Sequence, residues 1–517
     1  MLARSRCTTV LGIDAVPVGV EVDVAKGMSA FQIVGLPEAV VRESRDRIRS
    51  ALKNSGYGFP IGRITVNLSP ADIKKVGTGF DLAIALGILA ASRILAPDSV
   101  ENYLILGELS LDGRVNPVRG VLASAALVNA ESLQGIFVPA ANAAEAAAAG
   151  KTPVYGLRYL SEAVEHLTGR QFLKPQPSVD FETLAEKYSD TADMRDVAGQ
   201  EHAKRALEVA AAGGHNILMT GPPGSGKTML ARRLPGILPP LSFEEALDVS
   251  RVYSASGLLD ARTGLMVKRP FRAPHHTISD AGLVGGGSIP RPGEISLAHH
   301  GVLFLDEFPE FRKSLLEMLR QPLEDHTITV SRAATSLTFP AFIMLVAAMN
   351  PCPCGFAGST QKPCTCSLTH IDRYRAKISG PLLDRMDIQV EVPAVAYQDI
   401  RMAGTGESSK EVRERVLTAR IVQTERFAGK KLQCNAGMEA EDIRNFCKLE
   451  EKGDALLHQA AKTLHLSARG VSRVLKISRT IADLENSEII LPHHLAEAIQ
   501  YRRFQPELSG MPDFSKA

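Results

Sequence analysis

The octapeptide GPPGSGKT at residues 221–228 constrains the fold of this 517-residue chain more than any other stretch. It fits the pattern G-x-x-x-x-G-K-[S/T], in which a glycine-rich loop joins a buried strand to a helix and its backbone N–H groups surround phosphate oxygens. The preceding apolar run NILMT suits the strand, and the following residues continue with helical spacing. The sequence therefore predicts an α/β domain that binds a nucleoside triphosphate. The predicted phosphate-binding residues are Gly221, Pro222, Pro223, Gly224, Ser225, Gly226, Lys227 and Thr228.

Two carboxylates further along the chain complete a hydrolytic site. GVLFLDEF at 301–308 predicts a buried strand that ends in Asp306 and Glu307. The C-terminal ends of parallel strands meet at the nucleotide edge of such a sheet. We therefore expect Asp306 and Thr228 to hold Mg²⁺, Glu307 to orient or deprotonate the attacking water, and Lys227 to neutralise phosphate charge. The set predicts an ATPase with ATP and Mg²⁺ as cofactors.

A third strand-like run, FIMLVAAMN at 342–350, ends in Asn350. By the same edge argument, Asn350 is expected beside the γ-phosphate. The alternative is a turn residue that precedes Pro351.

The periodicity of the chain divides it into four segments. Strand-like runs at 31–36, 63–68, 103–109 and 135–140 alternate with helical runs at 37–54, 79–92 and 140–150. We expect an α/β domain over 1–170, a polar, Pro-containing linker over 171–193, the ATPase domain over 194–400, and a mostly helical lid domain over 401–517.

Charge and apolar patterning exclude several classes of protein. The formal net charge is only +2, so any nucleic-acid contact requires a local basic surface. The longest apolar window, at 82–91, is about half of the roughly 20 residues that a membrane span needs. Asp14 interrupts the N-terminal apolar run before a signal-peptide core forms. We expect a cytoplasmic protein with no membrane partner.

A resemblance rests on the motifs GPPGSGKT, RPFRAPHHT, PRPGEISLAHHGVLFLDEF, MNPCPCG and SGPLLDRMD, in this order. They resemble the magnesium-chelatase-like AAA+ ATPases, specifically the competence-protein ComM (YifB) family, and the resemblance covers nearly the whole chain. It implies a hexameric, ATP-driven, helicase-like motor that promotes branch migration in homologous recombination, notably in natural transformation. The implied partners are single-stranded and branched DNA, further copies of the chain in a ring, and recombination proteins.

The resemblance also assigns roles to arginines. Arg385 in LLDRMD would reach the nucleotide of the neighbouring subunit, so that hydrolysis requires a ring. Arg375 is the alternative for this role, and a simple ion pair of Arg385 with a flanking aspartate is the structural alternative. Arg469 in SARG, with Arg473 one turn later, would sense the γ-phosphate from the lid. The nucleotide roles of the family fall on Lys227, Thr228, Asp306, Glu307, Asn350 and Arg385.

Residues 1–170 resemble a second family. VGTGFDLAIALGIL and GELSLDGRVNPVRGVLASA are similar to the proteolytic domain of Lon protease, a ribosomal-S5-like α/β fold with a Ser–Lys dyad. Gly79 stands at the place of the serine, and Leu122 at the place of the lysine. Ser124 and Lys75 lie off the matching positions. Without a nucleophile and a base, we expect no peptide hydrolysis and a fold reused for assembly or DNA contact.

The segment from Arg251 to Gly293 is a candidate DNA contact. It contains six Arg and Lys residues and two acids, with a Gly run, as a loop that tracks a phosphate backbone would. The alternative is an ordinary solvated loop. The pairs His275–His276 and His299–His300 are expected to be structural or to form hydrogen bonds at the nucleotide site.

Four cysteines follow Asn350 closely. Cys352, Cys354, Cys364 and Cys366 form C-x-C-x₉-C-x-C, which supplies four thiolate ligands for a structural Zn²⁺. The alternative is a Pro-rich turn with incidental thiols. The odd total of seven cysteines fits reduced thiols better than a disulfide framework.

Two other functions compete with the DNA motor. The chelatase-like core suits an ATPase that remodels a protein partner. The Lon-like segment suits an ATP-dependent protease, which Gly79 and Leu122 oppose.

Overall fold

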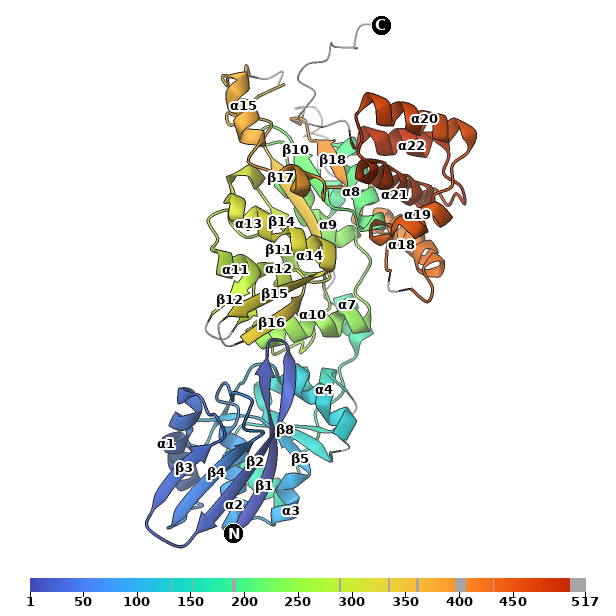
Figure 1. Cartoon of the computed structure of the whole chain (residues 1–517). Helices are drawn as coiled ribbons and strands as arrows, with labels where there is room; N and C mark the ends of the chain where they lie inside the picture. The colour runs from blue at the N-terminus through green and yellow to red at the C-terminus, as the bar shows by residue number, and fades with distance from the viewer. Residues whose placement is uncertain are drawn as a thin grey trace.

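The structure is a computed structural model that describes residues 1–131, 133–150, 152–187, 192–287, 290–332, 335–358, 362–395, 406–430 and 432–502 (Figure 1). The predicted lid boundary at residue 401 and part of the predicted linker lie outside these residues. A short helix, α7 (Phe181–Lys187), occupies the described part of the linker. Among the described helices, none is long and apolar enough to cross a membrane.

The N-terminal region is built on a seven-stranded mixed sheet in the order β3-β4-β2-β1-β5-β8-β9. Its strands are β1 (Leu2–Leu11), β2 (Asp14–Ala25), β3 (Ala30–Val34), β4 (Arg63–Ser69), β5 (Tyr103–Ile105), β8 (Gly135–Pro139) and β9 (Val154–Leu157). A separate pair is formed by β6 (Glu108–Leu109) and β7 (Val115–Asn116). The helices are α1 (Ala39–Asn54), α2 (Asp81–Ala91), α3 (Pro97–Glu101), α4 (Val121–Glu131), α5 (Ala143–Ala148) and α6 (Leu160–Leu167). The periodicity of the sequence did not identify the β1–β2 hairpin or α4.

Helix α2 explains the long apolar window of the sequence. Every residue from Asp81 to Ala91 is buried, because the helix packs against β1, β2 and α1. A helix that is apolar all round belongs in a core. Its one carboxylate, Asp81, accepts two hydrogen bonds from the Arg47 guanidinium, at 2.7 and 3.2 Å.

The central region is a five-stranded parallel sheet in the order β11-β14-β17-β10-β18. Its strands are β10 (Ile217–Thr220), β11 (Phe271–Arg272), β14 (Val302–Leu305), β17 (Met344–Met349) and β18 (Ile388–Glu391). The larger helices are α8 (Glu201–Gly213), α9 (Lys227–Ile237), α10 (Phe243–Ser256) and α15 (Leu368–Arg375). Shorter elements are α11 (Asp280–Val284), α12 (Glu294–Leu297), α13 (Lys313–Met318), α14 (Arg320–Asp325) and α16 (Gly380–Leu383), with hairpins β12 (Gly285–Gly286)–β13 (Arg291–Pro292) and β15 (Thr327–Arg332)–β16 (Thr335–Pro340).

The C-terminal region is helical and lies beside α8 and β18 (Figure 1). It contains α18 (Ser409–Arg426), α19 (Ala440–Phe446), α20 (Glu451–Thr463), α21 (Ala468–Leu484) and α22 (Pro492–Gln500). α18 and α21 pack on α8, and their apolar faces share one core with the sheet. The predicted α/β fold with a parallel sheet and a helical lid is confirmed.

The N-terminal region contacts the central region at two places. α4 and α5 pack on α10, where Leu122 and Ala148 share an apolar cluster with Val249 and Val252. The Glu145 carboxylate accepts a hydrogen bond from the Ser254 hydroxyl at the end of α10. The tip of the β1–β2 hairpin extends to the β15–β16 hairpin, and its Ile13 packs against both neighbouring cores (Figure 1).

Candidate active site

The glycine-rich loop after β10 has the conformation that its sequence requires. Gly224 and Gly226 have φ of +76° and +90°, in the left-handed region that favours glycine. A Cβ at Gly221 would lie 2.1 Å from the Val392 carbonyl oxygen. Helix α9 begins at Lys227, directly after the loop, so its free N–H groups and positive dipole end face the position that phosphates would occupy.

The predicted nucleotide residues converge at the C-terminal edge of the sheet. The Lys227 ammonium donates hydrogen bonds to the carbonyls of Gly221 and Pro222 at 2.7 and 2.9 Å, and burial lowers the pKa of Lys227. The Asn350 Oδ1 atom accepts from the Lys227 ammonium at 3.4 Å. The Thr228 hydroxyl donates to Asp306 Oδ2 at 2.7 Å. A hydroxyl and a carboxylate oxygen at this spacing fit the ligand preference of Mg²⁺, and the cradle fits ATP.

Glu307 lies at the same edge, and its partner is a histidine of one of the two pairs that the sequence offered for the nucleotide site. Its backbone is left-handed, with φ of 51°, and His276 Nδ1 lies 3.2 Å from Glu307 Oε2. His276 comes from the segment that follows β11. The neighbouring ring of His275 is 2.9 Å from the Thr277 hydroxyl instead. Of the two histidine pairs, this one therefore lies at the nucleotide site.

The second histidine pair is structural. His299 is buried, and its Nδ1 accepts a hydrogen bond from the backbone N–H of Phe342 at 3.1 Å. The proton of the neutral ring therefore sits on Nε2, which cannot then ligate a metal. His300 is in the left-handed region, with φ of 52°, and its Nδ1 lies 3.4 Å from Glu245.

The predicted arginines lie at the opposite end of the sheet. Arg385, Arg469 and Arg473 line a cavity of about 1050 Å³ between the sheet and the helical region. Asn216, at the start of β10, donates to the Arg385 carbonyl at 3.1 Å. Burial, with Arg469 and Arg473 next in effect, lowers the pKa of Arg385. The Arg385 guanidinium forms an ion pair with Glu324, so the expected alternative pairing with Asp384 or Asp387 is not the one observed.

The aspartates beside Arg385 pair with the lid instead. Arg473 lies 3.3 Å from Asp387 and 3.6 Å from Asp384, whereas Arg469 is exposed. The four residues of β10 alone separate this cavity from the phosphate loop by roughly 13 Å. Arg375, the alternative to Arg385, lies at the nucleotide end, where its Nε donates to the Pro351 carbonyl at 3.4 Å.

The four cysteines of the C-x-C-x₉-C-x-C motif gather at the nucleotide end. The Sγ atoms of Cys352, Cys354 and Cys364 lie 3.3 to 3.7 Å from one another, and Cys366 completes a group with all ligand atoms within 4.8 Å. Tetrahedral Zn²⁺ with Zn–S bonds of about 2.3 Å requires S···S separations of about 3.8 Å. Backbone N–H groups of Ala357 and Cys366 point at the sulfurs of Cys352 and Cys364. The donor set therefore fits a structural zinc.

At least three of the six cations in the predicted DNA segment pair with carboxylates of the same chain. Arg251 lies 3.5 Å from Asp248. The Arg272 guanidinium forms a bidentate pair with Glu294 at 2.6 and 2.7 Å. Arg269 is mostly buried and donates to Glu245 and to two proline carbonyls. These ion pairs engage Arg269 and Arg272, and the DNA contact of the segment as a whole stays a prediction. Arg262 and Arg291 are exposed.

The Lon-like positions are occupied by packing residues. Leu122 is 1% exposed and belongs to the cluster against α10, and a Cβ on Gly79 would make only ordinary contacts. Ser124 is buried and donates to the Gly120 carbonyl, while Lys75 is buried and donates to the Pro70 carbonyl. The two substitutes for a dyad therefore have separate backbone partners.

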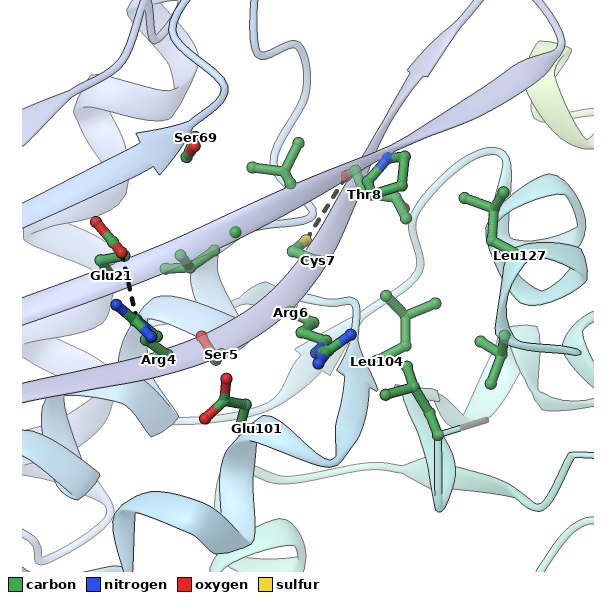
Figure 2. Close-up of a pocket in the computed structure, with 16 residues that line it drawn as sticks. Arg4, Ser5, Arg6, Cys7, Thr8, Glu21, Ser69, Glu101, Leu104 and Leu127 are labelled. Carbon is green, nitrogen blue, oxygen red and sulfur yellow. Dashed lines mark hydrogen bonds and ion pairs between the residues drawn. The ribbon is translucent and has the colours of Figure 1, made fainter. Parts of the chain in front are cut away.

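A pocket of about 280 Å³ on β1 and β2 also lacks an activated nucleophile (Figure 2). Arg4 pairs with Glu21 across it at 3.4 Å, and Cys7 donates to the Thr8 carbonyl at 3.6 Å. Burial raises the pKa of Cys7 to about 12, so it stays an unreactive thiol at neutral pH.

Comparisons with known proteins place these features in a family. Residues 193–400 match the family described as magnesium chelatase, subunit ChlI, residues 406–502 match its C-terminal part, and residues 20–142 match the description subunit ChlI of Mg-chelatase. The chain is 45% identical over 508 residues to the competence protein ComM of Haemophilus influenzae, which covers 97% of this chain and 98% of ComM. It is 43% identical over 504 residues to YifB of Salmonella typhimurium, covering 97% of each.

A further similarity is local. Lon protease 2 of Bacillus subtilis is 32% identical over 166 residues, which covers 29% of this chain and 28% of that protein. The full-length similarity to ComM and YifB, together with the phosphate loop and the strand-end acids, settles the family. The chain belongs to the ComM and YifB family of magnesium-chelatase-like AAA+ ATPases.

Proposed function

We propose that this protein is an ATP-hydrolysing ring motor that acts on DNA and promotes branch migration of recombination intermediates. One observation supports a ring assembly: Arg385 and Arg469 lie far from the phosphate loop of their own chain. A subunit thus holds two parts of a hydrolytic site at opposite ends of one sheet. In a ring, which we take to be the hexamer that the family resemblance implies, neighbouring subunits would bring these parts together.

In this mechanism each residue has one task. Lys227 would bind the β and γ phosphates, and Thr228 and Asp306 would hold Mg²⁺, which neutralises phosphate charge when bound. Glu307 orients the attacking water, and Asn350 fixes its geometry beside the γ-phosphate. Arg385 of the adjacent subunit stabilises charge that develops in the transition state, with Arg469 as the second arginine.

The DNA substrate is supported by the relatives and by the surface. ComM, at 45% identity over nearly its whole length, carries the name competence protein. Arg262 and Arg291 remain exposed for phosphate contacts after Arg269 and Arg272 are excluded. We assign single-stranded and branched DNA as the substrates and the cytoplasm as the site of action. We also assign a structural Zn²⁺ to Cys352, Cys354, Cys364 and Cys366.

Two measurements test this proposal. The first is ATP turnover with and without single-stranded, duplex and branched DNA at several salt concentrations. Stimulation by DNA that weakens with salt is expected, because phosphate contacts release counterions. Turnover that ignores every DNA, but rises with a protein ligand, would instead favour an ATPase that remodels a protein, as the chelatase similarity allows.

The second measurement tests the ring with a pair of inactive variants. Lys227→Ala keeps an intact arginine, and Arg385→Ala keeps an intact phosphate loop. Mixed before assembly, they place an intact loop against an intact arginine at some interfaces, so ATP turnover should reappear. Each variant alone is the control. If the mixture stays inactive although mixed rings form, Arg385 does not act between subunits.

A further inference from the structure

We propose that the four-cysteine loop, described over residues 352–358 and 362–366, is a metal-dependent clamp on the phosphate loop, so that metal occupancy sets how well the protein binds and hydrolyses ATP. This inference rests on the proposed ATPase function. The metal site would therefore support nucleotide binding and not DNA binding.

The first contact of the clamp joins the two loops directly. Gly355 follows Cys354 and has φ of +85°. A Cβ at Gly355 would lie 2.6 Å from Cδ and 2.7 Å from Cγ of Pro223, the third residue of the phosphate loop. The bare Cα of Gly355 therefore packs against the Pro223 ring. A substitution at Gly355 must push one of the two loops.

The second link runs through the chain itself to Asn350, the residue expected beside the γ-phosphate. Asn350, whose amide lies 3.4 Å from the Lys227 ammonium, precedes Cys352 by two residues. Cys352 is fully buried, and its carbonyl accepts a hydrogen bond from the Gly355 N–H at 3.0 Å. The turn that presents Gly355 to Pro223 is thus anchored on the first cysteine.

The third contact closes the loop at its other end. Directly after Cys366, Ser367 caps α15 by accepting from the His370 N–H. The last turn of α15 returns to the start of the loop, where Arg375 Nε donates to the Pro351 carbonyl and the backbone of Asn350 hydrogen-bonds the buried Tyr374 hydroxyl. Both ends of the four-cysteine loop are therefore fastened around Asn350.

A metal ion bound by the four sulfurs would hold these pieces together. Cys352 and Cys354 lie in the turn that ends at Gly355, and Cys364 and Cys366 lead into α15. Without the ion, the two halves keep weaker links, such as the Lys362 ammonium over the Phe356 ring at 5.5 Å, but lose the bonds through the four sulfurs. Pro223 and Asn350 would then lose their support.

The test compares four forms of the full-length protein: wild type with its metal, wild type stripped by a chelator under reducing conditions, the same sample refilled with Zn²⁺, and Cys364→Ser. The readouts are zinc content, affinity for a fluorescent ATP analogue, basal ATP turnover and DNA binding. We expect metal loss to lower nucleotide affinity and basal turnover by about tenfold to a hundredfold, the range for small displacements of catalytic groups. Zn²⁺ should restore both.

A glycine pair keeps the test valid if Cys364→Ser fails to fold. Gly355→Ala and Gly358→Ala both place a side chain at positive φ in the same loop, at +85° and +75°, but only the first meets Pro223, since nothing lies within 4 Å of a Cβ at Gly358. Gly355→Ala should keep its zinc and lose ATP affinity and turnover. Gly358→Ala should keep all three.

Three outcomes would overturn the clamp. Wild type that contains no tightly bound metal, metal-free protein with unchanged basal turnover, and metal loss that weakens only DNA binding each contradict it. The last result would make the loop a DNA contact. If wild type with its zinc hydrolyses no ATP at all, the proposed function fails, which is a different result from turnover that survives metal removal.

Discussion

Two sheets of this molecule carry sequence motifs that resemble those of known enzymes, but only one of them brings the expected catalytic residues together. In the five-stranded sheet, Lys227, Thr228, Asp306 and Asn350 contact one another at the strand ends. In the seven-stranded sheet, the Lon-like positions hold Gly79 and Leu122, and Leu122 packs against the other region. The five-stranded sheet brings the residues of the expected ATPase site together, whereas in the seven-stranded sheet the position expected for a protease lysine holds a leucine that packs against α10. Substitutions in the first should change turnover without stability, and those at Leu122 the reverse.

The largest effect is expected at Lys227. Lys227→Ala removes the ammonium that lies in the phosphate cradle, so ATP hydrolysis should fall below detection while the thermal unfolding temperature changes little. Steady-state turnover measures the loss of ATP hydrolysis, and a thermal melt measures the change in unfolding temperature. A large loss of stability would mean that Lys227 also supports the fold.

Arg385 should have the next largest effect. Arg385→Ala is expected to lower kcat by about 10³-fold, the lower end of the range for an arginine donated between subunits, with ATP affinity kept. Turnover measurements report kcat, and equilibrium nucleotide binding reports ATP affinity. Normal turnover by assembled Arg385→Ala rings would remove the intersubunit role.

Substitution of Leu122 tests whether the protease-like position of the seven-stranded sheet now serves packing. Leu122→Lys restores the residue type of the protease but places an ammonium in an apolar cluster, so unfolding free energy should fall by about 2–4 kcal/mol and casein should remain uncut. Gly79→Ser is the matched control, because a Cβ there makes only ordinary contacts, and it should shift stability by less than about 0.5 kcal/mol. Casein cleavage by the double variant would show that the second sheet kept a working site.

The smallest effect is expected at His276. His276→Ala frees Glu307 from an exposed partner that is worth about 0.2–1 kcal/mol, so ATP turnover without DNA should rise about twofold to fivefold. His275→Ala, whose ring contacts Thr277 instead, should leave it unchanged. A fall in turnover would mean that His276 positions Glu307 for the reaction and does not restrain it.

Local motifs predicted the chemistry of this chain better than its packing. The phosphate loop and the strands that end at Asp306 and Asn350 depend on neighbouring residues, and the sequence located them. The β1–β2 hairpin was missed although both strands carry the period of a strand. Valines alternate with other residues from Val16 to Val24 in β2, and exposed and buried residues alternate in the first half of β1. The contact of Gly355 with Pro223 could not be predicted, since it joins two loops more than a hundred residues apart. The position of Arg385 at the far end of the sheet likewise depends on tertiary structure.

The hairpin tip at Gly12 and Ile13 has a practical consequence for the study of the ATPase region alone. Gly12 lies against Leu337 and Phe339 of β16. Ile13 packs against one apolar cluster of the central region and against the cluster that joins Leu122 to α10. A fragment that begins near residue 194 lacks this hairpin, so it would expose Leu337, Phe339 and the apolar face of α10 to water. Such a truncated protein should aggregate on expression, and adding the N-terminal half as a separate polypeptide during expression should restore its solubility.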